Sequence, residues 1–386
     1  MFTETFLPST DGVVTRLLYT LRELERLGHQ TLVLGPDGGP SEYAGARVVG
    51  FPGSRFYLYP EKRAIWPSAR VTDLLTDFQP DVIHTLNPTV FGIQAIISSR
   101  LMGVPLVASY HTHFAHYAKL YGYGWISGAI WAYMRLLHNR AALNLCTSEA
   151  TRQELQRRGF RRLRVWSHGV DLERFRPRPV DPAMRARLSG GHPERTVLTF
   201  VGRLAPEKQI ERLVPLLQAV DGICLAIVGD GPTRRELEQR FQGLPAVFTG
   251  YLQGEDLANA YAASDAFIFP STTETLGLVL LEAMATGLPV IAARSAPSLE
   301  LLDGGQAALL YEGDDPRSLA ETVRGFLRSP ELRARLREAS LRRASTRGWE
   351  KPTQELLGYY REALAGSTER PVTHEPLSDG AAFGGR

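Results

Sequence analysis

The chain has 386 residues, which predicts two domains rather than one hydrophobic core. Hydrophobic residues make up 44% and charged residues 22%, a balance that excludes a chain disordered throughout its length. The formal net charge of only +3 excludes nucleic-acid binding through overall charge, so we expect no nucleic-acid partner.

The sequence also disfavours a protein held by disulfides or metals and a protein that spans a membrane. The two cysteines, Cys146 and Cys224, each lie inside an apolar run, which predicts buried free thiols rather than a disulfide or metal framework. The most apolar long stretch, 125–137, is shorter than the roughly 20 residues of a membrane span, and the first residues lack the pattern of a signal peptide. We therefore expect a cytoplasmic protein that does not span the membrane.

In the first half, short apolar runs alternate with segments of helical periodicity, the pattern of a parallel sheet with crossover helices. Helices are predicted at 14–27, 71–77 and 118–140, and strands at 30–35, 46–51, 81–85, 105–110 and 143–148.

The second half repeats this scheme, with strands predicted at 196–202, 224–229, 246–251, 265–270 and 289–293. Three prolines within "FRPRPVDP" place the linker at 175–181. The sequence thus predicts an α/β protein of two doubly wound domains, at 1–176 and 177–348, with a last helix at 349–365 and a disordered tail at 366–386.

Two glutamates, Glu274 and Glu282, stand eight residues apart in "ETLGLVLLEAMATGLPV". Glu274 follows a predicted strand, and Glu282 falls about one turn into a helix that begins near Leu276 and Gly277. A helix N-terminus at the carboxyl end of a parallel strand suits a diphosphate, and flanking carboxylates would bind hydroxyls of a sugar and a ribose. The alternative is that Glu274 only caps the helix and Glu282 is exposed.

Two cations, Arg203 and Lys208, follow another strand in "FVGRLAPEK". On a turning loop they can converge on a diphosphate, although two solvated surface charges are the alternative. The segment "VGDGP" at 228–232 is a glycine turn where a backbone can approach a ligand, but an ordinary tight turn is the favoured interpretation.

In the first half, Gly12 lies between the first strand and the first helix, a position where phosphates approach a backbone. His111 and His113 in "ASYHTHF" end a strand, which is where α/β proteins build their sites. A structural role is the alternative for each histidine. Because no acidic residue or cysteine stands at ligand spacing from them, we predict no metal site there.

Taken together, "FTETFLPSTDGVVTR", "ASYHTHF", "VGRLAPEK", "VGDGP" and "ETLGLVLLEAMATGLPVIAAR" resemble the large family of retaining glycosyltransferases with the GT-B fold, over about residues 1–365. Within it, "TDGVVTR", "SYHTH" and "TTETLGLV" are most similar to the sulfoquinovosyltransferases of sulfolipid synthesis, which pass sulfoquinovose from UDP-sulfoquinovose to diacylglycerol. Lipid mannosyltransferases of the family are the nearest competitor.

The resemblance implies that 1–176 is the acceptor-side domain and 177–348 the nucleotide-sugar donor domain. It also implies roles for individual residues. Gly12, Arg203 and Lys208 would hold the diphosphate with backbone N–H groups around Gly277, and Leu276 and Leu278 flank that glycine. The backbone around Leu252 would bind the base, Glu282 the ribose and Glu274 the donor sugar, while His111 would stand near the reacting sugar. Catalysis would be mainly electrostatic and would need no metal and no cofactor besides the nucleotide-sugar co-substrate.

In two places the chain departs from the family pattern. Residues 295–300 read SAPSLE where the family usually has a Gly-Gly-x-Pro-Glu type turn, so the sugar specificity at this loop is open. The chain also starts at "MFTETF", where the family usually has several apolar residues of a central first strand. We therefore expect the natural product to begin upstream of Met1, the alternative being a short start compensated by packing.

The resemblance thus implies a retaining hexosyltransferase, and we expect it to act on a lipid at the inner face of the cytoplasmic membrane. A GDP-mannose or UDP-glucose dependent glycolipid transferase and a catalytically silent nucleotide-sugar binder are the alternatives. A dinucleotide oxidoreductase is disfavoured because Gly12 stands alone where G-x-G-x-x-G is required.

A membrane-docking segment is also predicted, at 117–137, where aromatic residues crowd a helical pattern and an arginine cluster follows at 157–164. The aromatic residues are Tyr121, Tyr123, Trp125, Trp131 and Tyr133. The alternative is that these rings belong to the core of the first domain.

Overall fold

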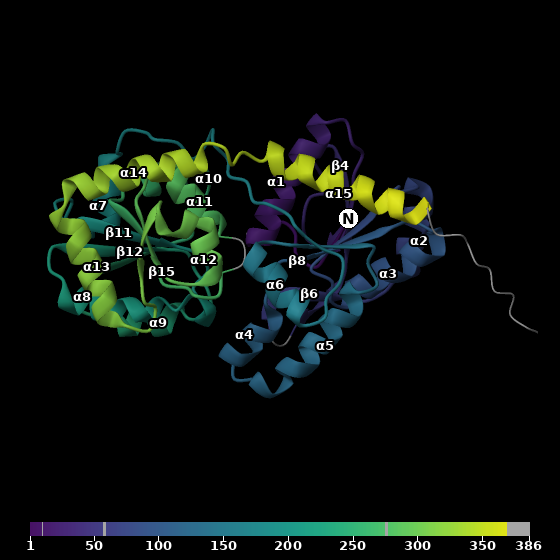
Figure 1. Cartoon of the computed structure of the whole chain (residues 1–386), viewed down its shortest axis with the longest axis horizontal. Coiled ribbons are helices and arrows are strands. Elements are labelled where there is room, and N and C mark those ends of the chain that lie inside the picture. Colours follow the sequence, from purple (N-terminus) through teal and green to yellow (C-terminus); the bar gives the residue numbers. More distant parts are fainter. Residues whose placement is uncertain (10, 57–58, 275–276, 369–386) are drawn as a thin grey trace, which may run out of the picture.

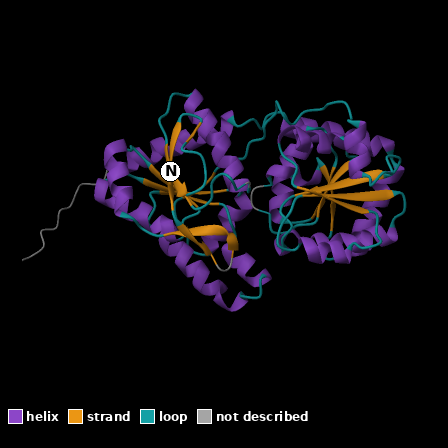
Figure 2. Cartoon of the chain, turned by 180° about the vertical axis from the view of Figure 1, so that it is seen from behind, coloured by secondary structure: helices purple, strands orange, loops and turns teal. Residues whose placement is uncertain are grey.

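The computed structural model describes residues 1–9, 11–56, 59–274 and 277–368. These form two lobes, each with a parallel sheet enclosed by helices (Figures 1 and 2). The predicted α/β class with two doubly wound domains is confirmed.

The sheet of the first lobe is parallel except for β3, which pairs antiparallel with β4. Its strand order is β10 (Leu163–Val165), β9 (Leu143–Cys146), β8 (Leu106–Tyr110), β7 (Ile83–Leu86), β1 (Phe2–Thr3), β2 (Leu32–Pro36), β4 (Ala46–Phe51) and β3 (Glu42–Tyr43). A separate hairpin joins β5 (Gly53–Phe56) to β6 (Tyr59–Ile65). The five predicted strands form, whereas β3, β10 and the hairpin were not predicted because their runs are short or polar.

The helices of this lobe are α1 (Gly12–Arg26), α2 (Ala69–Phe78), α3 (Val90–Met102), α4 (Phe114–Leu120), the 3₁₀ turn η1 (Gly124–Ile126), α5 (Ser127–His138) and α6 (Glu149–Arg157). The prediction of one helix over 118–140 is wrong. Gly122 adopts a φ of 84°, which ends α4, and the chain restarts through η1 into α5.

The second sheet is entirely parallel among the described strands, in the order β13 (Ala246–Gly250), β12 (Ile223–Val228), β11 (Thr196–Val201), β14 (Ala266–Phe269), β15 (Val290–Ala293) and β16 (Ala308–Tyr311). The prediction covered all of these except β16. The helical elements around this sheet are α7 (Pro182–Leu188), η2 (Pro206–Lys208), η3 (Ile210–Leu213), α8 (Val214–Ala219), α9 (Arg234–Arg240), α10 (Gly254–Ala262), α11 (Leu278–Ala285), α12 (Ala296–Leu301), η4 (Asp303–Gly305), α13 (Pro316–Arg328) and α14 (Pro330–Ala344).

Both faces of this sheet are buried, which explains why its strands are almost continuously apolar. Along β11, Val197 and Val201 enter one apolar cluster, whereas Leu198 and Phe200 enter the other. Cys224 on β12 is a buried free thiol, and so is Cys146 on β9, as predicted.

The last helix, α15 (Glu350–Thr368), returns from the second lobe and packs on the first (Figure 1). Trp166 donates from Nε1 to the Pro352 carbonyl at 2.8 Å, and the Tyr359 hydroxyl donates to the Val165 carbonyl at 2.6 Å. The helix includes residues 366–368, which we expected in a disordered tail, and the rest of that tail lies outside the described residues. The chain therefore crosses between the lobes twice.

Candidate functional site

Between the lobes lies a pocket of about 120 Å³, lined by loops that follow the parallel strands and by residues of α11, α12 and α14. The first lobe contributes Thr147, Ser148, Ser167 and His168, and the second contributes Glu274, Gly277, Glu300 and Arg347 among others. Strand carboxyl ends are where doubly wound domains bind ligands, so this position fits a two-domain ligand site.

Glu274 and Lys208 form an ion pair in this pocket region, with 2.7 Å between Lys208 Nζ and Glu274 Oε2. Their side chains are only 18% and 13% exposed, so the alternative that Lys208 is a solvated surface charge is wrong. Glu274 Oε1 also accepts the Gly277 N–H at 3.2 Å, just before α11. The Glu274 carboxylate thus lies where a lysine and a helix N-terminus converge, the environment that an anionic phosphate prefers.

Gly277 is required here for steric reasons. Its φ is 61°, and a Cβ at this position would lie 2.6 Å from Leu301 Cδ2. The next residue, Leu278, packs in one apolar cluster with Phe6 and Val13 of the first lobe. The start of α11 therefore lies against the start of α1, where Gly12 is the first helical residue and Asp11 is its N-cap. The predicted donor residue Leu276 lies outside the described residues.

Arg203 is 14% exposed and pairs with Glu207, with 3.3 Å between Arg203 Nη1 and Glu207 Oε1. Glu207 is itself buried and accepts a hydrogen bond from the Tyr121 hydroxyl of the first lobe at 3.2 Å. Arg203 is therefore not a solvated charge either. Both predicted diphosphate-binding cations are held by carboxylates beside the interdomain contact.

Glu282 lies on α11 and accepts a hydrogen bond from the Tyr261 hydroxyl at 2.9 Å. Burial raises the pKa of Glu282 to about 7, and the hydrogen bond from Tyr261 only partly offsets that rise. The alternative of an exposed Glu282 is wrong, because the residue is half-buried. Such a carboxylate can accept hydrogen bonds from ribose hydroxyls when it is ionised.

His111 follows β8 and is buried, with its Nε2 2.8 Å from Ser109 Oγ. Ser109 Oγ also lies 3.0 Å from His84 Nε2, and His84 Nδ1 lies 2.7 Å from the Tyr360 hydroxyl on α15. Burial lowers the pKa of His84 to about 3, so this ring is neutral. The chain of hydrogen bonds connects α15 to the predicted catalytic histidine and fixes its orientation.

The remaining glycine turn, 228–232, approaches protein rather than ligand. A Cβ on Gly229 would lie 1.9 Å from the Gly202 carbonyl oxygen, and one on Gly231 would lie 2.3 Å from that of Leu204. The turn therefore supports the loop that carries Arg203. Leu252, expected near the base, is buried after β13.

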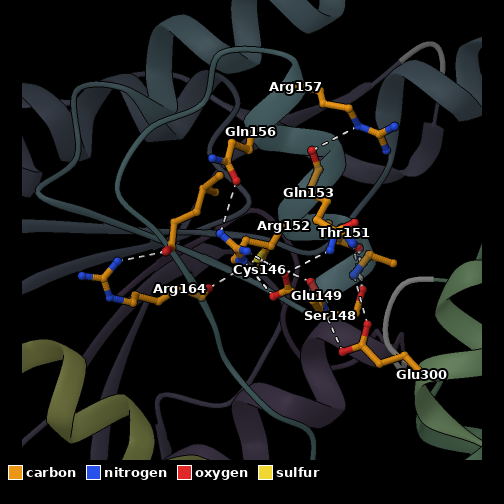
Figure 3. Close-up of polar contacts among 12 residues, drawn as sticks. Cys146, Ser148, Glu149, Thr151, Arg152, Gln153, Gln156, Arg157, Arg164 and Glu300 are labelled. Carbon is orange, nitrogen blue, oxygen red and sulfur yellow. Dashed lines mark hydrogen bonds and ion pairs between the residues drawn. The ribbon is translucent and has the colours of Figure 1, made fainter. Parts of the chain in front are cut away.

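Glu300 is a site residue that the sequence analysis missed. It lies on α12 of the second lobe, and its carboxylate accepts the backbone N–H groups of Glu149 at 2.8 Å and Ala150 at 3.0 Å in the first lobe (Figure 3). These are the first residues of α6, whose N-cap is Ser148. The loop that departs from the family pattern thus forms a helix capped by Ser295 that presents Glu300 across the domain interface.

A cluster with metal-ligand spacing was also missed, because it depends on the tertiary fold. Ligand atoms of His113, His116 and Glu154 lie within 4.8 Å of one another. Glu154 Oε1, however, already contacts His116 Nε2 at 3.0 Å and Arg158 at 3.2 Å. The pKa of Glu154 is lowered to about 2, chiefly by the hydrogen bond from His116. The guanidinium supplies the positive charge that a metal would otherwise bring.

Comparison with known proteins places two family models on the two lobes. The model described as Glycosyltransferase Family 4 matches residues 10–174, and Glycosyl transferases group 1 matches residues 187–343. The chain is 36% identical to the sulfoquinovosyl transferase SQD2 of Arabidopsis thaliana, over 89% of this chain and 69% of that protein. It is 37% identical to a GDP-mannose-dependent alpha-mannosyltransferase of Mycolicibacterium smegmatis, over 94% of this chain and 96% of the relative.

Among solved structures, the complex of Anabaena Alr3699/HepE with UDP and glucose has a TM-score of 0.76 at 21% identity. The match covers 93% of this chain and 98% of the other, and it supports the fold. Within the described residues, no helix is long and apolar enough to cross a membrane.

Proposed function

Because the chain belongs to the group 1 glycosyltransferases, we propose that it is a retaining enzyme that transfers sulfoquinovose from UDP-sulfoquinovose to diacylglycerol. The observation that carries the choice of sugar is the identity to the Arabidopsis sulfoquinovosyl transferase across nearly the whole chain. We place the reaction at the inner face of the cytoplasmic membrane, where a lipid acceptor is available to a peripheral protein.

The charges of the site support this chemistry. Arg203, Lys208 and the N-terminus of α11 are positioned to stabilise negative charge on a leaving diphosphate. Lys208 exchanges Glu274 for the diphosphate when the donor binds, which frees the Glu274 carboxylate for hydroxyls of the sugar. Two cations and a helix dipole together perform the neutralisation that a metal would otherwise supply, so the proposed reaction requires none.

His111 and Glu282 complete the proposed site. The hydrogen bond between His111 Nε2 and Ser109 Oγ fixes the His111 ring just after the end of β8. Glu282 binds the ribose in its ionised form, and Leu252 and its neighbours contact the base. With no protein nucleophile required, the acceptor hydroxyl attacks on the face that the diphosphate leaves.

A sulfonate-bearing sugar needs cationic and hydroxyl partners, and the interdomain pocket offers both. Arg343 and Arg347 line it together with Glu274 and Gly277, and Ser148, Ser167 and Ser298 supply hydroxyls. The Arg343 guanidinium already donates hydrogen bonds to the carbonyls of Glu300 and Leu301, both at 3.0 Å. Arg347 is therefore the better candidate to bind the sulfonate.

A GDP-mannose-dependent lipid transferase is the second candidate, favoured by the equally high identity to the mycolicibacterial enzyme. The deciding assay incubates the protein with diacylglycerol and either UDP-sulfoquinovose, UDP-glucose or GDP-mannose, and follows lipid products by mass spectrometry. The anomeric configuration of the product, read by NMR coupling constants, tests retention.

The expected result is sulfoquinovosyl diacylglycerol from UDP-sulfoquinovose alone, with an α-linkage as in the donor. Arg347→Gln is expected to raise KM for UDP-sulfoquinovose while leaving any residual UDP-glucose reaction unchanged. Transfer from GDP-mannose alone contradicts the sugar assignment, and nucleotide-sugar binding without transfer or hydrolysis contradicts the assignment as an enzyme.

A further inference from the structure

Exposed apolar side chains are concentrated on one part of the first lobe. Among the described residues, ten large hydrophobic side chains are exposed, and six of these lie on α3, α4, η1 and α5: Ile97, Leu101, Leu120, Trp125, Tyr133 and Leu136. Trp125 is 83% exposed and Leu101 is 75% exposed, values far from those of a packed core. Such a concentration marks an interaction surface rather than scattered surface residues.

These elements are neighbours in space. Helix α5 contacts α3, α4 and η1, and the Tyr133 hydroxyl on α5 donates to the Thr89 carbonyl at the start of α3 at 3.2 Å. In Figure 1, α4 and α5 extend along the lower edge of the first lobe, on the side opposite α15, and α3 lies between them and that helix. We call this surface, formed by the outward residues of α3, α4, η1 and α5, the α3–α5 face.

The segment that carries the α3–α5 face has charged side chains of one sign. The chain contains 41 acidic residues, but none between Asp81 and Glu149, the segment that includes all four elements. The exposed charges there are cationic, on Arg100, Lys119, Arg135 and Arg140. Arg135 and Arg140 line a hollow with Ala132, Leu136 and Asn139 at the end of α5.

The structure also corrects which aromatic rings can reach a bilayer. Trp131 is in the core, stacked on Tyr110 and covered by Arg158, and Tyr121 is bound to Glu207 of the second lobe. Trp125 and Tyr133 remain exposed, and the apolar residues of α3 join them although no aromatic pattern indicated that helix.

We propose that the α3–α5 face docks on an anionic bilayer, with Trp125 and the exposed leucines entering the headgroup boundary and Arg135 and Arg140 contacting lipid phosphates. Exposed apolar groups on a segment without acidic residues suit this partner, because an anionic surface attracts the arginines while the interface accepts the indole and aliphatic chains. The inference rests on the proposed lipid acceptor, which the docked orientation would bring to the same lobe that carries His111.

The test is flotation of the full chain with vesicles of phosphatidylcholine, alone or mixed with phosphatidylglycerol. We expect the wild-type protein to float with the mixed vesicles and not with phosphatidylcholine alone. Trp125→Ser/Leu136→Ser and Arg135→Glu/Arg140→Glu are each expected to reduce the bound fraction by about tenfold or more. The matched controls are Trp66→Ser, which removes another exposed tryptophan of the same lobe, and Arg317→Glu/Arg328→Glu on α13, and both should float like the wild type.

Each outcome bears on the inference. Equal flotation of the face variants and the controls overturns it, as does wild-type protein that stays unbound on both vesicle types. A change in size-exclusion volume of the face variants, with unchanged flotation, identifies the face as a contact between copies and also overturns it.

Transfer to dioctanoylglycerol in solution separates this inference from the proposed function. The face variants should keep that activity while losing vesicle binding, which supports the docking surface. A wild-type protein that floats as expected but glycosylates no diacylglycerol leaves the surface in place and removes only the proposed acceptor.

Discussion

Glu282→Gln should make the protein more stable at alkaline pH while weakening donor binding. The pKa of Glu282 is raised from 4.5 to about 7 by burial in the folded state. Between these two values the folded chain retains a proton that the unfolded chain has released. Stability therefore falls as pH rises from about 4.5 to about 7 and is level above that range.

The size of the effect follows from the shift. Each pKa unit corresponds to about 1.4 kcal/mol, so the rise from 4.5 to about 7 makes ionising Glu282 cost at most about 3.5 kcal/mol at pH 8.5. Glu282 is partly exposed, and solvent screening reduces this to about 1–3 kcal/mol. Glutamine keeps an oxygen that can accept the Tyr261 hydrogen bond but carries no charge. At roughly 2–4 °C per kcal/mol for a domain of this size, the variant should melt several degrees above wild type at pH 8.5.

The assay is thermal denaturation of both proteins at pH 5 and pH 8.5, with and without UDP. The gain of the variant should be present at pH 8.5 and shrink toward pH 5, where Glu282 is protonated in the folded wild-type protein. The UDP-induced rise in melting temperature should be smaller in the variant, because a charged acceptor for the ribose is lost. Glu338→Gln on α14, whose side chain is 71% exposed, is the control and should change neither quantity. A gain that is the same at both pH values would refute the assignment of the effect to ionisation of Glu282.

Three further outcomes are expected. Lys208→Ala and Glu274→Ala should each lower the rate of single-turnover transfer by at least about 100-fold, while the melting temperature stays within a few degrees of wild type. A folded variant with a near wild-type rate contradicts the site assignment. Glu300→Ala should loosen the interdomain contact, lowering transfer by about 5- to 30-fold and increasing the radius of gyration in small-angle scattering, whereas Glu312→Ala on the same lobe should leave both unchanged. Dialysis against EDTA should leave transfer unchanged, and loss of activity that Mg²⁺ or Zn²⁺ restores would show that the reaction needs a metal.

Much of the fold is predictable because its signals are local. Parallel strands buried on both faces are mainly apolar, so β8, β11, β12 and β14 can be recognised as short apolar runs. The strands that escaped prediction are short or lie at a sheet edge, where one side is not buried. The single helix predicted at 118–140 failed because a helical pattern of apolar residues continues through Gly122, whose φ of 84° ends α4.

Site residues can be predicted from the sequence where they lie close together along the chain. Glu274, Gly277 and Glu282 fall on one strand–loop–helix unit, so their spacing alone places them around a helix N-terminus. The pairing of Glu274 with Lys208 joins residues 66 positions apart, and no spacing rule indicates it.

Only the tertiary structure determines the contacts between segments that are distant in sequence. Glu300 caps the N-terminus of α6, which is about 150 residues away in sequence. Tyr121 hydrogen-bonds Glu207, and His84 hydrogen-bonds Tyr360 on α15. Whether an aromatic residue is buried was also decided there, since Trp125 and Trp131 are six residues apart yet one is exposed and the other lies in the core. Local sequence sets which elements form, whereas burial and electrostatic pairing depend on which elements pack together, and only the three-dimensional arrangement specifies that.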